Sequence, residues 1–209
     1  VLCYALYRQP NNRAASVLRG ELSMKQSHMA LVQGLTWLQT TLLDLLFPPQ
    51  CVGCRAYGAL FCAACAQRVE PVGLHICTCC GRPQPIRVAQ CEQCQRQASL
   101  IIETVRIAAL HTDPLRQAIH AFKYDGRREL AEPLARYLVA LSQTLPDQAR
   151  LRTVDGVAPV PLYSTRRQER GYNQAELLAS AFCRSVQLPL CSTWLIRQRS
   201  TQSQVGLTA

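Results

Sequence analysis

Residues 51–94 read "CVGCRAYGALFCAACAQRVEPVGLHICTCCGRPQPIRVAQCEQC" and hold nine of the twelve cysteines of the chain. Eight of these nine form four C-x-x-C pairs, at Cys51/Cys54, Cys62/Cys65, Cys77/Cys80 and Cys91/Cys94. Two thiolates separated by two residues can lie on one tight turn and bind the same metal ion, and two such turns complete a tetrahedral site. The spacing therefore predicts two small zinc ribbons with one zinc ion each.

The pairing of the four turns has two solutions. Sequential pairing places the first two pairs on one ion and the last two on the other, and we favour it over interleaved pairing. Four sulfur ligands leave no position for a water molecule, so we expect structural rather than catalytic zinc. A disulfide scaffold is the competing interpretation, but it needs an oxidising compartment and a secretion signal. The start of the chain, "VLCYALYRQPNNR", lacks the charged and apolar regions of such a signal.

The chain is basic, and its basic residues are nearly all arginines. Lys plus Arg is 23 against 13 acidic residues, for a formal net charge of +10, and Lys25 and Lys123 are the two lysines. Eight zinc-bound thiolates on two ions would lower this charge to about +6. Arginine binds planar anions through paired hydrogen bonds, which favours a phosphate-bearing partner. An arginine-rich genome is the alternative explanation of the same composition.

The N-terminal part offers no membrane anchor. Its most apolar run, residues 35–47, is too short to cross a bilayer and contains Asp44. We therefore expect no transmembrane segment and a cytoplasmic protein, with residues 1–47 as an extension that carries a short apolar helix. The chain begins with Val1 and its methionines are Met24 and Met29, so we expect residues 1–23 or so to precede the natural start or to come from a mis-set reading frame.

The second half changes to a pattern of alternating strands and helices. Residues 101–110 are rich in β-branched side chains and predict a strand, and 112–124 predict a helix with Pro114 in its first turn. Leucines at helical spacing predict a second helix over 130–145, residues 154–161 predict a buried strand, and a capping box predicts a helix over 173–186. This order is typical of an α/β domain with a mainly parallel sheet.

Residues 159–174, "PVPLYSTRRQERGYNQ", join the second predicted strand to the last helix. Ligands of α/β sheets bind at the carboxyl ends of strands, and helix N-termini attract anions. Arg166, Arg167 and Arg170 add three cations at this place, which predicts a phosphate or pyrophosphate site. A solvated loop whose charges face water is the alternative.

Lys123 lies in the segment "FKYDG" at the end of the first predicted helix. Because it is one of two lysines and adjoins the turn at Gly126, we expect its ammonium to face the same ligand. The alternative is a solvated lysine at a helix end.

Four segments in this order resemble the ComF family, also described as GntX-like. They are the C-x-x-C pairs, "LRQAIHAFKYDGRREL", "PVPLYSTRRQERGYNQAELLA" and "RQRSTQSQVGL", and the resemblance spans residues 48–207. It implies a double zinc ribbon in residues 48–98, followed in residues 99–209 by a partial type I phosphoribosyltransferase-like domain with a Rossmann-like, mainly parallel sheet.

The resemblance also implies roles for individual residues. The turn that contains Pro161 would occupy the place of the pyrophosphate-binding loop, with the arginines and Gly171, Asn173 and Gln174 beside it. A hood over the site would contain Arg197, Thr201, Gln202 and Gln204.

The sequence departs from the family pattern in one respect. The family's phosphoribosyl diphosphate loop has two adjacent acidic residues and follows the segment that resembles "SQVGL", whereas this chain has no two adjacent acidic residues. We therefore expect a C-terminally truncated domain whose enzymatic activity is in question. Mg²⁺ would serve only a full-length enzyme, which would be an active phosphoribosyltransferase of nucleotide metabolism.

Three functions follow from these patterns. The first is a ComF-like protein of DNA uptake and natural competence that binds phosphoribosyl diphosphate, pyrophosphate or single-stranded DNA and works with other competence proteins. The second is an active phosphoribosyltransferase, once the missing part is restored. The third is a zinc-ribbon interaction module without catalysis. Neither lysine follows a glycine, so the sequence has no P-loop, and it has no H-E-x-x-H or G-x-S-x-G motif.

Overall fold

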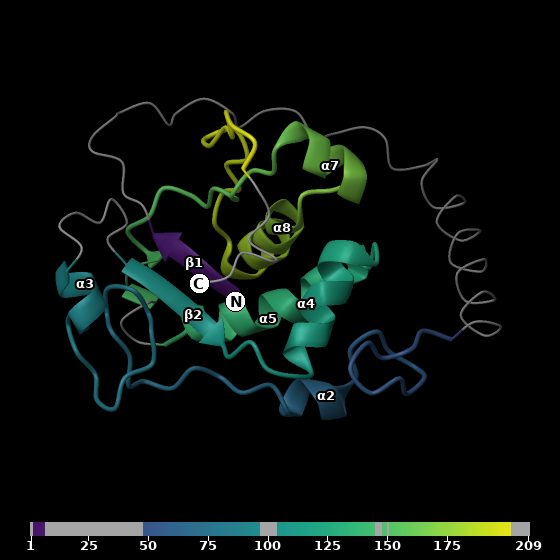
Figure 1. Cartoon of the computed structure of the whole chain (residues 1–209), viewed down its shortest axis with the longest axis horizontal. Helices are drawn as coiled ribbons and strands as arrows, with labels where there is room; N and C mark the ends of the chain where they lie inside the picture. Colours follow the sequence, from purple (N-terminus) through teal and green to yellow (C-terminus); the bar gives the residue numbers. More distant parts are fainter. Residues whose placement is uncertain (1, 7–47, 97–103, 145–147, 150, 202–209) are drawn as a thin grey trace.

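The computed structural model describes residues 2–6, 48–96, 104–144, 148–149 and 151–201 (Figure 1). The predicted apolar helix and the predicted natural start lie outside these residues, as do Gln202, Gln204 and the boundary between residues 98 and 99. In the part of the chain that is described, no helix combines the length and apolar character needed to cross a bilayer.

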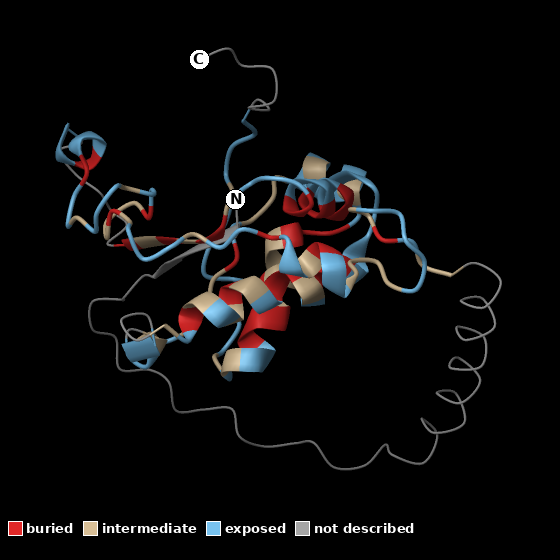
Figure 2. Cartoon of the chain, turned by 90° about the horizontal axis from the view of Figure 1, so that it is seen from below, coloured by how far each residue is buried: buried red, intermediate tan, exposed pale blue. Residues whose placement is uncertain are grey.

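Three helices build the larger core. They are α4 (Leu115–Tyr124), α5 (Ala131–Ser142) and α8 (Gln174–Val186), with the short 3-10 turn η1 (Arg128–Leu130) before α5. Apolar residues recur at helical spacing and form one buried cluster with the helices. In Figure 2 the buried parts of the helices, in red, lie where the helices face one another. These helices confirm the three helices predicted from the sequence.

The sheet is smaller than predicted. Strand β2 (Thr104–Ala109) confirms the strand predicted over 101–110 and pairs antiparallel with β1 (Leu2–Leu6). Within the described ranges this two-stranded antiparallel pair is the whole sheet, so the mainly parallel sheet is not found there. The phosphoribosyltransferase-like assignment of residues 99–209 stays a prediction.

The strand predicted over 154–161 is wrong. In its place the structure has a single parallel bridge between Val157 and Leu190. Pro159 and Pro161 explain the difference, because proline has no N–H to donate to a ladder of backbone hydrogen bonds. This segment therefore forms one bridge only.

The arginine stretch is a helix rather than a loop. Helix α7 (Ser164–Arg170) ends at Gly171, whose φ of 72° is the left-handed conformation that commonly closes helices. Asn173 then starts α8 as predicted, because its side chain accepts a hydrogen bond from the N–H of Ala175. The predicted capping box is wrong in its second half, since Glu176 accepts from Arg167 on α7 instead.

The two zinc-ribbon segments carry the short helices α2 (Ala63–Gln67) and α3 (Glu92–Arg96), which lie apart from each other (Figure 1). The first segment packs on the larger core through the partly buried side chains of Val52, Leu60 and Phe61. The second forms a separate small cluster around its buried cysteines. It is joined to β2 by a hydrogen bond of 2.8 Å from Val105 N–H to the Cys79 carbonyl.

Candidate zinc centres and a cationic pocket

The four sulfurs of the first cysteine cluster lie within 4.8 Å of one another. This cluster consists of Cys51, Cys54, Cys62 and Cys65. A second cysteine cluster meets the same criterion and consists of Cys77, Cys80, Cys91 and Cys94. Both groups follow the sequential pairing that the sequence favours.

The spacing of the sulfurs fits zinc. Four sulfurs at about 2.3 Å from a central ion in a tetrahedron lie about 3.8 Å apart. The distance from Cys54 Sγ to Cys62 Sγ is 3.6 Å, and that from Cys80 Sγ to Cys91 Sγ is 3.8 Å. The two clusters therefore have both the ligand type and the dimensions of closed, structural zinc sites.

Hydrogen bonds from backbone N–H groups lower the pKa of one thiol in each cluster, Cys51 in the first and Cys77 in the second. Burial alone would raise the pKa of Cys51, but hydrogen bonds from the N–H groups of Cys62, Cys54 and Gly53 outweigh it and lower the pKa to about 6. Burial is likewise outweighed at Cys77, and backbone N–H groups lower its pKa to about 6. The turns that carry the C-x-x-C pairs thus donate hydrogen bonds to these two sulfurs and favour their thiolate forms.

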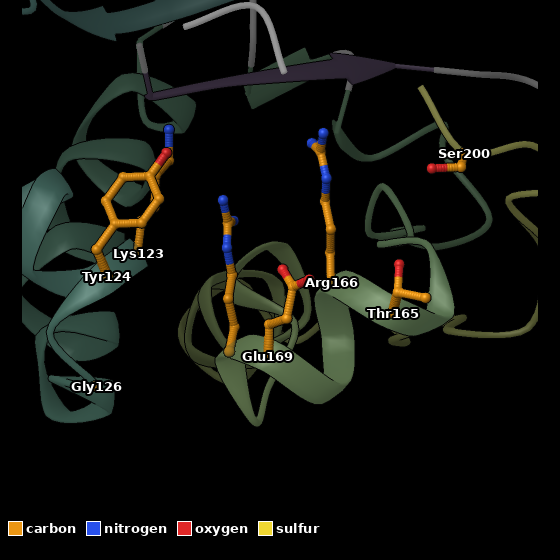
Figure 3. Close-up of a pocket in the computed structure, with 8 residues that line it drawn as sticks. Lys123, Tyr124, Gly126, Thr165, Arg166, Glu169 and Ser200 are labelled. Carbon is orange, nitrogen blue, oxygen red and sulfur yellow. The ribbon is translucent and has the colours of Figure 1, made fainter. Parts of the chain in front are cut away.

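The predicted anion-binding residues lead to a second site. A pocket of about 700 Å³ lies between the end of α4 and helix α7 (Figure 3). It is lined by Lys123, Tyr124, Gly126, Thr165, Arg166, Glu169, Arg170 and Ser200. Three cations and one carboxylate face this space, which we call the cationic pocket.

The cations of the cationic pocket come from two helices. Lys123 lies in the last turn of α4, and its side chain and that of Arg166 on α7 extend toward the same side of the pocket (Figure 3). Arg166 donates a hydrogen bond of 2.8 Å to the Thr201 carbonyl. The guanidinium of Arg170 lies 4.9 Å from the centre of the Tyr124 ring and donates to Gln174 Oε1 at 3.1 Å. These contacts hold both arginines in place.

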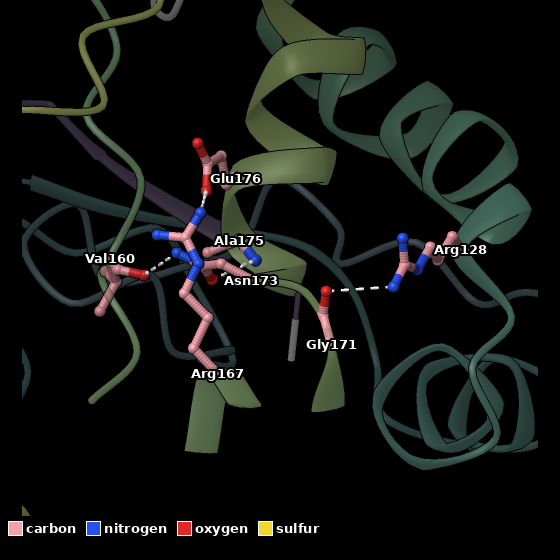
Figure 4. A network of polar contacts seen from close by, with 7 residues as sticks. All are labelled: Arg128, Val160, Arg167, Gly171, Asn173, Ala175 and Glu176. Carbon is pink, nitrogen blue, oxygen red and sulfur yellow. Dashed lines mark hydrogen bonds and ion pairs between the residues drawn. The ribbon is translucent and has the colours of Figure 1, made fainter. Parts of the chain in front are cut away.

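Arg167 is placed differently from the other two arginines. It points to Glu176 on α8, with 3.5 Å between its Nη2 and the carboxylate (Figure 4). It is not among the residues that line the cationic pocket. Arg166 and Arg170 lie four residues apart, on one face of α7, and line the pocket. Arg167 lies on another face and pairs with Glu176 of α8.

Three further predicted residues support the pocket without lining it. Asn173 is buried, caps α8 and donates to the Val160 carbonyl at 3.2 Å (Figure 4). Buried Gln174 donates to the Lys123 carbonyl at 3.3 Å while it accepts from Arg170, so it links the two walls. The Gly171 carbonyl accepts from Arg128 at 3.0 Å (Figure 4).

The predicted hood is described only in part. Arg197 donates to the Pro161 carbonyl at 3.5 Å and also to the Thr201 hydroxyl. Because the Thr201 carbonyl accepts from Arg166, this segment adjoins the cationic pocket. Pro161 itself is not among the residues that line it.

Known proteins resemble the chain in both of its parts. Residues 42–99 match the double zinc ribbon domain family. The DNA utilization protein YhgH of Salmonella typhimurium is 30% identical over 169 residues, which cover 79% of this chain and 74% of that protein. This chain belongs to the ComF family. Competence protein F of Haemophilus influenzae is 27% identical over 164 residues, with 77% and 70% of the two chains covered.

The match to competence protein ComFC of Bacillus subtilis is 30% identical over 135 residues. It covers 62% of this ComF-family chain, which spans 54% of the length of that relative. No solved structure matches the chain.

Several residues of the cationic pocket in this ComF-family chain were not predicted. They are Tyr124, Gly126, Thr165, Glu169 and Ser200. Tyr124 directly follows Lys123, and an aromatic residue beside a predicted phosphate-binding cation was a signal that could have found it. Thr165 and Glu169 were missed because helix α7 was not predicted, and without it the face that these residues share with Arg166 could not be recognised.

Proposed function

We propose that the chain takes part in DNA uptake and utilisation and that its cationic pocket binds the phosphate groups of single-stranded DNA or phosphoribosyl diphosphate. The observation that carries the proposal is the convergence of Lys123, Arg166 and Arg170 from two helices on one pocket. Relatives named for competence and for DNA utilization support the role in uptake. The charge of the pocket supports a phosphate-bearing ligand.

Charge favours a ligand with more than one phosphate. The three cations exceed the single carboxylate of Glu169, so the pocket has a net positive charge. Arginine binds phosphate oxygens through paired N–H groups, whereas lysine acts as a compact point charge. Because Gln174 and Tyr124 already hold Arg170, less conformational freedom is lost when a phosphate binds.

Binding rather than transfer is the function that this pocket supports. Cations neutralise phosphate charge, but phosphoribosyl transfer also requires that the ribose and its acceptor be positioned. In this proposal the zinc ribbons have a structural role, and Mg²⁺ has none in binding. For a role of the ribbons as an interaction module, the candidate residues are the exposed arginines Arg55, Arg68, Arg82 and Arg87.

The test measures the affinity of the zinc-loaded chain for a short fluorescent oligothymidylate by anisotropy, between about 50 and 200 mM salt. Lys123→Ala, Arg166→Ala and Arg170→Ala should each weaken binding and reduce the logarithmic salt slope by about 0.7 for each lost phosphate contact. Arg116→Ala is the matched control, because Arg116 lies on α4 at the end away from Lys123 and pairs with Asp113. If the variant with all three pocket substitutions keeps the wild-type salt slope, the binding surface lies outside the pocket, and the ribbons are the next candidate.

Competition separates the two sources of phosphate. Phosphoribosyl diphosphate or pyrophosphate that displaces the oligonucleotide from the wild type would place both ligands in the cationic pocket. Oligonucleotide binding that neither compound displaces would leave DNA as the ligand. An oligonucleotide that does not bind at all would contradict the proposal for DNA.

A further inference from the structure

We infer that Tyr124 is a base-stacking residue, so that the cationic pocket selects single-stranded nucleic acid by one nucleobase as well as by phosphate. This inference rests on the proposed function and names the ligand class within it. It is carried by the Tyr124 ring, which is the aromatic side chain in the lining of the pocket.

Tyr124 is exposed in a polar setting. It is the last residue of α4, and 53% of its surface is accessible. A large ring in contact with water gains little from its apolar area until another planar group covers it. Covering such a ring with a base is favourable for any of the bases, because each of them has a π-face.

Two neighbouring side chains limit the orientation of the Tyr124 ring. The Arg170 guanidinium lies 4.9 Å from its centroid, and the ring of His120 lies 4.9 Å away at an interplanar angle of 44°. His120 is itself next to the Asp125 carboxylate, with 3.9 Å between Nδ1 and Oδ2. Because these neighbours restrict the ring before a ligand arrives, stacking costs less side-chain entropy.

The remaining groups suit a nucleotide backbone. Lys123 and Arg166 lie in the same pocket, so a phosphate on either side of a stacked base can reach a cation. A positive groove combined with an aromatic ring is the arrangement that binds single strands without reading their sequence. A duplex keeps both faces of its bases covered and therefore gains nothing from Tyr124. Phosphoribosyl diphosphate has no aromatic ring to stack.

The experiment compares an oligothymidylate with an abasic oligomer of the same length and phosphate count, using the full zinc-loaded chain. The wild type should bind the base-bearing strand about tenfold more tightly. Tyr124→Leu should remove this preference, because it weakens binding of the base-bearing strand about tenfold more than binding of the abasic strand, which loses only the contact between Tyr124 and Arg170. Tyr124→Trp should restore the preference, because indole also offers a flat π-face.

The alternatives give different results. If Tyr124 only positions Arg170, Tyr124→Leu will weaken binding of both strands by the same factor, and the inference is overturned. Equal affinity of the wild type for the two strands overturns it without any variant. The proposed function fails separately, namely when neither strand binds or when Lys123→Ala and Arg170→Ala leave the abasic affinity unchanged.

Discussion

The hydroxyl of Tyr172 donates a hydrogen bond to the main-chain carbonyl of Phe122, one residue before Lys123. The two aromatic rings are 6.0 Å apart, and the guanidinium of Arg128 lies 4.7 Å from the centre of the Tyr172 ring. Tyr172 is buried and directly precedes the cap of α8. This contact therefore fixes the end of α4 relative to the start of α8, and with it the walls of the cationic pocket.

Removing this hydroxyl should destabilise the chain. Tyr172→Phe keeps the buried ring but leaves the Phe122 carbonyl without this donor, so we expect the free energy of unfolding to fall by about 1 kcal/mol. Urea denaturation measures the change. Tyr57→Phe is the control, because Tyr57 is 68% exposed and its hydroxyl can bond to water. Equal losses in the two variants would contradict a structural role for the Tyr172 hydroxyl.

Alkaline pH should selectively weaken the wild type. Burial raises the pKa of Tyr172 above its ordinary value of 10.0, so the folded state keeps the proton that the unfolded state loses. The contribution of the neutral phenol is complete below about pH 10 and is lost as the pH rises through the folded-state pKa. Unfolding measured from neutral to alkaline pH should show the gap between wild type and Tyr172→Phe shrinking. A constant gap would argue against the raised pKa.

Gly171 should tolerate alanine less well than Gly126 does. Both glycines have positive φ, 72° and 68°, so each replacement carries backbone strain of about 1 kcal/mol. A Cβ on Gly171 would also lie 2.9 Å from Arg128 Nη2, so the guanidinium would have to leave its hydrogen bond to the Gly171 carbonyl and its contact with the Tyr172 ring. No atom within 4 Å would meet a Cβ on Gly126. Gly171→Ala should therefore show the lower melting temperature. Equal melting temperatures would mean that Arg128 moves aside without cost.

Arg167 and Arg170 should differ in their effect on oligonucleotide binding. Arg170→Ala removes a cation from the pocket and should reduce the salt slope by about 0.7, while Arg167→Ala should leave both slope and affinity nearly unchanged. Arg167 has Glu176 as its partner and does not line the pocket. Anisotropy titrations of the two variants decide the matter. A larger effect of Arg167→Ala would restore the arrangement expected from the sequence.

Metal analysis should find two zinc ions in each chain purified under reducing conditions, one for each cysteine cluster. Cys51→Ser removes a buried zinc ligand and should reduce the content to one ion, with a lower melting temperature. Cys183→Ser is the control, since Cys183 is buried in α8 outside both clusters. Zinc content near zero, with the cysteines in disulfides, would contradict both centres.

Sequence patterns predicted those features that depend on residues close together in the chain. The C-x-x-C spacing predicted both cysteine clusters, and apolar residues at helical spacing predicted the three long helices. The strand over 154–161 failed because the apolar pattern was weighed above the missing N–H groups of Pro159 and Pro161.

The sequence predicted the positive charge of the pocket but not which side chains line it. The sequence indicated Lys123 and all three arginines, since cations near a strand end and a helix start favour an anion, and Arg166 and Arg170 do line the pocket. It could not separate Arg167 from Arg170, because that depends on the turn of α7 and on where Glu176 comes to lie. The contribution of Tyr124 likewise depends on a contact with Arg170, which is distant in the sequence.

The hydroxyl of Tyr137 on α5 donates a hydrogen bond of 3.1 Å to the Ala66 carbonyl on α2, within the first zinc ribbon. In the same ribbon, a Cβ on Gly53 would lie 2.8 Å from the Pro114 side chain at the start of α4. The first zinc ribbon therefore contacts both α4 and α5 closely. By mass action, an ion that binds only the folded ribbon also stabilises any helix that unfolds together with the ribbon. Zinc bound at the first cysteine cluster would therefore stabilise the helices around the pocket as well as the ribbon.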